Sequence, residues 1–162
     1  MPTARAAAAA TLAAVAAGRT LESATADAER PGGAAAGLDR RDRGFARLLV
    51  RTALRRRGQI DAVLGAFLAR PLPSRYAFEW ALLRVGAAQL LFFDVPAYAA
   101  VAATVDAAGG SVLRGLLNAV LRRVAREGPA LASAVDPARA NTPVWLWPVS
   151  YTHLTLPTKR IV

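Results

Sequence analysis

The chain has 162 residues, of which 54% are hydrophobic, so its length suits one domain with a real core, and global disorder is excluded. Its net charge of +10 favours a polyanionic partner, meaning nucleic acid or an anionic membrane surface. The absence of cysteine excludes disulfides, thiolate metal sites and a cysteine nucleophile, and a single histidine excludes clustered histidine metal sites. Alanine is abundant and strand-like alternation is absent before residue 149, so we expect an all-α protein.

The amino-terminal part predicts two helices and a loop. Residues 1–18 superficially resemble a secretory signal, but their apolar run is mostly alanine and a second helical pattern follows directly. A first helix is therefore favoured, with Leu12 and Val15 facing the core. Thr20 suits the N-cap of a second helix, which stops at a Gly/Pro-rich loop over residues 31–38.

The densest charge cluster lies in a predicted helix over residues 39–57, which carries eight arginines and two aspartates. Asp39 suits its N-cap, and Asp42 lies beside the positive helix end. The side chains expected to face inward are Phe45, Leu48, Leu49, Thr52 and Ala53. On the opposite side, arginines recur every fourth residue at Arg43, Arg47, Arg51 and Arg55, and Arg40, Arg41, Arg56 and Arg57 thicken the two ends.

Two interpretations of this arginine ridge stay open. An ordinary solvated helix face is one of them. However, like charges four residues apart destabilise a helix by a few tenths of a kcal/mol per pair, and no acid follows Asp42 within the helix to relieve the repulsion. A phosphate backbone would relieve it, which favours polyanion binding.

Two further segments supply most of the predicted core. Residues 59–69 follow the spacing of an amphipathic helix, and residues 76–93 are apolar on every side, so we expect the second segment to be the central helix of a bundle. Glu79 and Arg84 interrupt its apolar run and Asp94 ends it, which excludes a membrane span.

The last two predicted helices follow Pro96 and Ser111. A Gly-Gly pair between them indicates a turn, because no strand precedes it and no nucleotide-binding glycine motif is present. We expect Gly128 and Pro129 to end the final helix. Its outer side carries Arg114, Asn118, Arg122 and Arg126 at intervals of four. An asparagine in mid-helix is unfavourable unless its amide finds a partner.

Several blocks, in this order, resemble the NusB/RsmB helical RNA-binding family. They are residues 39–61 (DRRDRGFARLLVRTALRRRGQID), 70–72 (RPL), 82–96 (LLRVGAAQLLFFDVP), 99–106 and 116–122 (LLNAVLR). The resemblance covers about residues 5–147. It implies an all-α, NusB-like bundle of about seven helices in residues 1–130, followed by a linker in residues 131–148. Tyr98 stands where the family often has a histidine, so no contact of that histidine is carried over.

Two versions of the family imply different functions. One is the amino-terminal domain of a 16S ribosomal RNA (cytosine-C5) methyltransferase, which LLNAVLRR and the N-x-P-x-W-L segment at 141–146 resemble. In that case the chain is truncated before a catalytic domain that binds S-adenosylmethionine, and alone it is expected to bind no cofactor and to be inactive, because it lacks the catalytic cysteine and a glycine-rich nucleotide loop. The alternative is a free-standing transcription antitermination factor that binds nascent RNA with a small ribosomal protein. A third possibility is a helical protein-interaction domain whose arginines reflect a GC-rich genome.

We therefore expect ribosomal or nascent RNA as the partner, no membrane, no catalytic or metal-binding residue in this chain, and a cytoplasmic location. The expected RNA-binding residues are Arg40, Arg41, Arg43, Arg47, Arg51, Arg55, Arg122, Arg123 and Arg126. Residues 149–162 hold the only lysine and histidine but no alanine, so we interpret them as a non-native tail and give His153 no role. A short terminal strand is the alternative for this tail.

Overall fold

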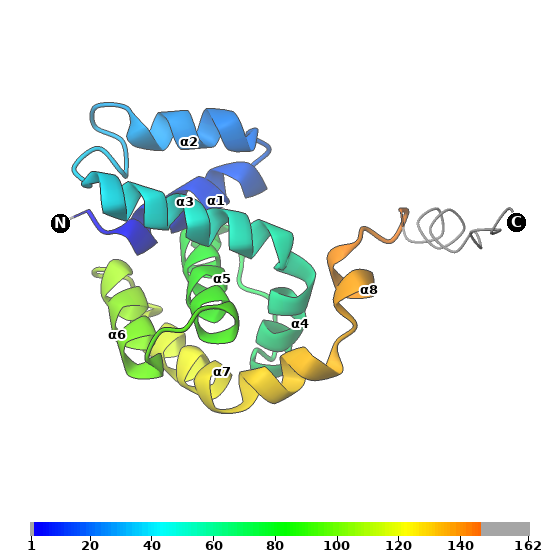
Figure 1. Ribbon diagram of the computed structural model, residues 1–162. Coiled ribbons are helices and arrows are strands. Elements are labelled where there is room, and N and C mark those ends of the chain that lie inside the picture. Colours follow the sequence, from blue (N-terminus) through cyan, green and yellow to red (C-terminus); the bar gives the residue numbers. More distant parts are fainter. Residues whose placement is uncertain (1, 147–162) are drawn as a thin grey trace, which may run out of the picture.

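Helices form almost all of the regular structure. The computed structural model describes residues 2–146, and this part contains eight α-helices, one 3-10 turn and no strand (Figure 1). The helices are α1 (Ala4–Ala16), α2 (Leu21–Glu29), α3 (Arg40–Arg55), α4 (Arg57–Phe67), α5 (Ala77–Phe92), α6 (Ala97–Ala107), α7 (Arg114–Ala134) and α8 (Pro137–Asn141), with η1 (Ser74–Tyr76) before α5. The all-α prediction is confirmed, with one helix more than the seven expected. The predicted tail at 149–162 lies outside the described residues.

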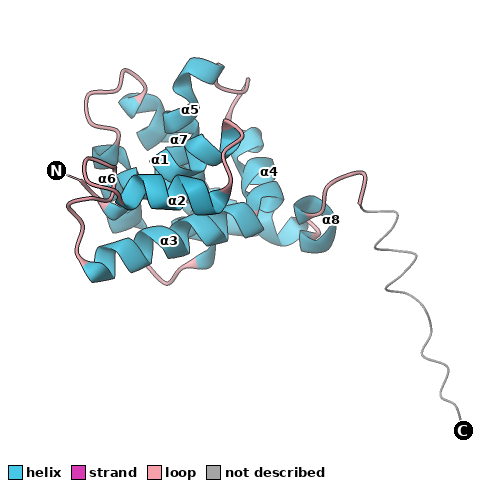
Figure 2. Ribbon diagram, turned by 90° about the horizontal axis from the view of Figure 1, so that it is seen from above, coloured by secondary structure: helices cyan, strands magenta, loops and turns pink. Residues whose placement is uncertain are grey.

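The central position of α5 follows from its sequence. Because it is apolar on every side, it must be enclosed, and α1, α3, α4, α6 and α7 all pack against it (Figures 1 and 2). Leu82, Leu83 and Val85 are fully buried in its middle. Gly86 allows α7 to approach closely, since a Cβ atom at this position would lie 2.6 Å from Leu121 Cδ2. None of the helices in the described residues is long and apolar enough to cross a membrane.

Local capping signals are realised as the sequence predicts. The Thr20 side chain accepts a hydrogen bond from the Ser23 backbone amide at 3.2 Å, and Asp39 Oδ1 accepts one from the Asp42 amide at 2.7 Å. These bonds satisfy amide donors that a helix start leaves free. The cap at Asp39 fixes where α3 begins.

Most of the predicted inward face of α3 is confirmed, because Leu49 and Ala53 are buried and Phe45 and Thr52 are half-buried, but one residue of it is wrong. Leu48 was expected inward, but 49% of its surface is exposed, whereas Val50 is 3% exposed. The buried residues of α3 are Ala46, Leu49, Val50 and Ala53. α1 and α5 pack against α3, and the direction of this packing decides which stripe of α3 is buried. The local sequence does not reveal this direction. Of the two side chains expected inward from the first helix, Leu12 is buried and Val15 is half-buried.

The expected helix end at Gly128 and Pro129 is also wrong, because α7 continues to Ala134. A proline inside a helix removes one hydrogen bond and costs about 3 kcal/mol. Tertiary packing offsets this cost: Gly128 is buried against α5, where a Cβ atom would lie 3.1 Å from Leu91 Cδ2, and Leu131 packs on the core.

After α7, the short helix α8 docks on α4 through its backbone. A Cβ atom at Gly58 would lie 1.6 Å from the carbonyl oxygen of Ala140, so only glycine permits this approach. Beside it, the Gln59 backbone amide donates to Asn141 Oδ1 at 3.1 Å, and Asn141 Nδ2 donates to Gln59 Oε1 at 3.0 Å. Part of the segment at 131–148, expected to be a linker, is thus helical and packed.

Candidate functional site

The arginine ridge lies mostly at the surface of α3, and one edge of it faces α2. Arg40, Arg41, Arg51 and Arg55 are exposed, and Arg43 is half-buried. None of these five takes part in an ion pair within residues 2–146. Apart from a coulombic interaction between Arg43 and Glu29, the fold does not neutralise their mutual repulsion, which leaves a concentration of positive charge at the surface.

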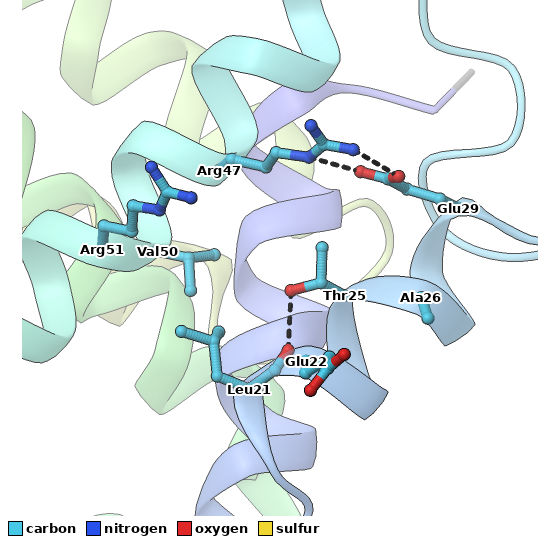
Figure 3. Close-up of a pocket in the computed structure, with 8 residues that line it drawn as sticks. All are labelled: Leu21, Glu22, Thr25, Ala26, Glu29, Arg47, Val50 and Arg51. Atoms are coloured by element: carbon cyan, nitrogen blue, oxygen red, sulfur yellow. Dashed lines mark hydrogen bonds and ion pairs between the residues drawn. The ribbon is translucent and has the colours of Figure 1, made fainter.

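Arg47 differs from the rest of the ridge because it is bound by a carboxylate. Its Nε donates to Glu29 Oε1 at 2.7 Å and its Nη2 donates to Glu29 Oε2 at 2.5 Å, a bidentate pair that ties α2 to α3 (Figure 3). The hydrogen bond from Arg47 lowers the pKa of Glu29, and Arg43 adds a smaller coulombic contribution in the same direction. The same pair raises the pKa of Arg47. One of the four regularly spaced arginines is thus neutralised internally.

The space beside this ion pair is a groove of about 580 Å³ between α2 and α3 (Figure 3). Both charge signs line it, with Glu22 and Glu29 opposite Arg47 and Arg51, and Val50 forms an apolar wall. Arg47 and Arg51 belong to the ridge, so on this edge the ridge lies opposite the carboxylates of α2. In the part of the chain that the structure describes, no group of three or more His, Cys, Asp or Glu side chains could hold a metal ion.

Arg5 is a candidate site residue that the sequence reasoning missed. It is half-buried on α1, and its Nε donates to Gln89 Oε1 at 2.9 Å. Its guanidinium carbon lies 5.6 Å from the centre of the Phe45 ring. Burial lowers the pKa of Arg5, and the nearby Asp42 carboxylate opposes this shift. Arg5 and Arg41 both line a surface depression of about 560 Å³ at the start of α3.

A buried hydrogen-bond chain fixes the orientation of Arg5. Thr104 Oγ1 donates to the Ala100 carbonyl at 2.7 Å, so its oxygen is left to accept from Gln89 Nε2 at 3.2 Å. Gln89 Nε2 also donates to the Val85 carbonyl at 3.1 Å, which directs Oε1 toward Arg5. A signal was present in the sequence, because Arg5 shares the buried helical stripe of Ala8 and Leu12, where an unpartnered charge is unfavourable.

The three arginines predicted on α7 do not join the ridge. The body of α5 lies between α3 and α7 (Figure 1). Arg126 Nη2 pairs with Glu127 at 2.7 Å, and Arg123 lies 4.6 Å from the centre of the Phe67 ring and 4.0 Å from Glu127. Arg122 is exposed and has no ion pair among the described residues. The nine predicted residues therefore fall into two separate groups.

Comparison with known proteins agrees with this architecture. The sequence profile of the NusB family matches residues 2–126. The ribosomal RNA small subunit methyltransferase B of Xanthomonas campestris is 45% identical over 112 residues, which are 67% of this chain and 24% of that protein. The enzyme of the same name from Pseudomonas putida is 38% identical over 115 residues, 67% of this chain and 26% of its own length. A putative methyltransferase of Mycobacterium tuberculosis is 38% identical over 112 residues, 67% of this chain and 24% of its own length. The chain thus spans about a quarter of the length of the relatives it matches.

Proposed function

Because the chain belongs to the NusB family, we propose that it is an RNA-binding domain whose phosphate-binding surface is the unpaired part of the α3 ridge together with Arg5. The observation that carries this proposal is the group of five arginines on α3 without an ion pair in residues 2–146. Guanidinium groups bind phosphate oxygens in bidentate fashion, and binding releases counterions from the nucleic acid.

Arg5 strengthens this surface because it is held in place before any ligand arrives. Most exposed arginines lose side-chain entropy when they bind. The Gln89 bond removes part of that cost for Arg5, since one of its nitrogens is already fixed. Arg5 lines the depression at the start of α3 together with Arg41, and Asp39 and Asp42 line it as well. Contacts of this kind orient an RNA strand without reading its sequence.

We further propose that the RNA is ribosomal and that the domain serves a small-subunit ribosomal RNA methyltransferase. The similarity to proteins of that name, over their amino-terminal quarter, supports this assignment. Chemistry and S-adenosylmethionine binding would then belong to the part of those proteins that this chain does not match, and its own residues would bind and orient the substrate RNA. The genomic codons downstream of residue 146 test this: a continuous frame encoding a cysteine-containing, glycine-rich catalytic domain supports it. A stop codon there would favour a free-standing antitermination factor.

The RNA surface itself is tested by charge reversal. The double variant Arg51→Glu/Arg55→Glu changes two exposed, unpaired side chains one helical turn apart. We expect this variant to bind a fragment of 16S ribosomal RNA at least about tenfold more weakly. We also expect the negative slope of log K against log salt to become less steep by about 0.7 for each phosphate that the variant no longer neutralises. Electrophoretic mobility shifts between about 50 and 200 mM salt measure both quantities.

The matched control carries the same change in net charge elsewhere. Arg70 and Arg75 are exposed in the loop and turn between α4 and α5, so Arg70→Glu/Arg75→Glu lowers the charge by the same amount away from the ridge. Its affinity and salt slope should stay close to those of the parent. If the two double variants weaken binding equally, total charge rather than the ridge governs the interaction, and the proposed surface is wrong.

A further inference from the structure

The strongest feature outside the ridge is a groove between α6 and α7, which pack side by side. One cavity of about 430 Å³ there is bounded by Tyr98 on α6 and by Asn118 and Arg122 on α7. A second cavity of about 440 Å³ meets it at Asn118, and the ion pair between Arg114 and Asp106 lies at its edge. Between the polar groups the lining residues are mostly alanine, valine and glycine, so a flat ligand can lie against the helix surfaces.

Three side chains of this groove have no partner within the described residues. Tyr98 is 80% exposed in the first turn of α6. Asn118 is half-buried in α7, and neither end of its amide forms a hydrogen bond with residues 2–146. Arg122, one helical turn further on, is exposed without an ion pair in that part of the chain. The ring, the amide and the guanidinium are therefore available to a ligand.

The combination matches the chemistry of a nucleotide. An exposed aromatic ring stacks on the face of a base, an amide offers one acceptor and two donors to a base edge, and a guanidinium holds a phosphate. An acidic peptide would use Arg122 and would bond the Asn118 amide through its backbone, but without an aromatic side chain it has no flat face to stack on Tyr98.

We propose that the groove between α6 and α7 binds one nucleotide of single-stranded RNA, with its base stacked on Tyr98, its edge hydrogen-bonded to Asn118 and its phosphate held by Arg122. The proposal rests on the RNA-binding function proposed above and adds base readout to it. The ridge lies on α3 and the groove on α6 and α7, and α5 lies between α3 and α7, so the two surfaces act as separate contacts (Figure 1). The ridge contributes electrostatic affinity, and the groove contributes base preference.

The test compares binding of short, fluorescently labelled A, C and U homo-oligomers by anisotropy, with a 2-aminopurine oligomer to report stacking. Tyr98→Ala should weaken binding about five- to a hundredfold without changing the salt slope, because stacking releases no counterions. Asn118→Asp, which replaces two amide donors by acceptors at the same shape, should change the order of preference among the oligomers. Arg122→Gln should make the negative slope of log K against log salt less steep by about 0.7.

Two comparisons, with Trp145→Ala and with the ridge variant, separate this proposal from the function on which it depends. Trp145 is 76% exposed but lies outside the groove, so Trp145→Ala removes an exposed aromatic ring and should leave binding unchanged. If Tyr98→Ala and Asn118→Asp leave affinity and base preference unchanged while the ridge variant weakens binding, the groove proposal is refuted and the RNA-binding function stands. If the parent protein binds none of the oligomers and no ribosomal RNA, both are refuted. If an acidic peptide protects Tyr98 from nitration and RNA does not, the groove proposal is also refuted. Thermal melts establish that each variant is folded.

Discussion

The bond between Arg5 and Gln89 gives the most quantitative prediction. Arg5 Nε donates to the amide oxygen of Gln89 at 2.9 Å, and Gln89 is fully buried. A hydrogen bond to a charged group contributes about 1.5–3 kcal/mol to stability. In Gln89→Met this bond is lost but a side chain of similar length fills the space, which offsets part of the loss. We therefore expect the variant to be destabilised by about 2 kcal/mol, which for a chain of this size lowers Tm by about 4–8 °C.

A double-mutant cycle isolates this bond from its surroundings. Urea unfolding of the parent, Arg5→Met, Gln89→Met and the double variant gives the coupling free energy between the two residues, which we expect to be about 1–3 kcal/mol. Thr104→Val serves as a comparison, because it removes a partner of Gln89 without touching Arg5. A coupling below about 0.5 kcal/mol would refute the view that Gln89 holds Arg5. Gln89→Met should also weaken RNA binding, since Arg5 then has to be ordered by the ligand.

Two further predictions concern the elements that border the ridge. Gly58→Ala should displace α8 and destabilise the fold by about 2 kcal/mol, because two hydrogen bonds of roughly 1 kcal/mol each are broken, and hydrogen exchange at the Gln59 amide should become faster. The control Gly65→Ala should be neutral or stabilising, because a Cβ atom there meets open space. Equal effects of the two variants would contradict the docking of α8 on α4. The pKa of Glu29 is lowered by its hydrogen bond from Arg47, so the pair stabilises the folded state above the ordinary pKa of 4.5, and this stabilisation is lost as the pH falls through the lowered pKa. Unfolding free energies of the parent and Glu29→Gln should therefore converge as the pH falls below about 4.5, and a constant difference down to about pH 2 would show that the pair contributes nothing through ionisation.

Features that depend on neighbouring residues alone could be predicted from the sequence. The caps at Thr20 and Asp39 form because a side-chain oxygen reaches an amide three residues later, whatever the rest of the fold does. The central place of α5 also follows from composition, because a helix that is apolar on all sides has no other stable position.

Features set by tertiary packing could not be predicted in the same way. Three consecutive apolar residues at 48–50 allow more than one inward stripe, and only the approach of α1 and α5 selects Val50 over Leu48. The rule that proline stops a helix failed at Pro129 because packing of Gly128 and Leu131 against the core offsets the missing backbone bond.

In the candidate site, too, local features could be predicted from the sequence and tertiary contacts could not. Its arginines are visible in the sequence, and their presence on one helix follows from a four-residue spacing. Their pairing is not visible, because Arg47 pairs with Glu29, which lies on a helix 18 positions earlier.

The start of α8 could have been predicted from the sequence. Asp136 followed by Pro137 is a helix-start signal, and Asp136 Oδ1 accepts from the Ala138 amide at 2.9 Å.

The contact between α4 and α8 also decides where the stable unit can be cut. The family match ends at residue 126, in the middle of α7, but the interlocked part of the fold reaches Asn141. A recombinant protein that stopped at the family boundary would uncover the buried Gln59 and the bare backbone beside Gly58, and would lack the last turns of α7. Expression trials of this domain should therefore retain the chain through at least residue 141.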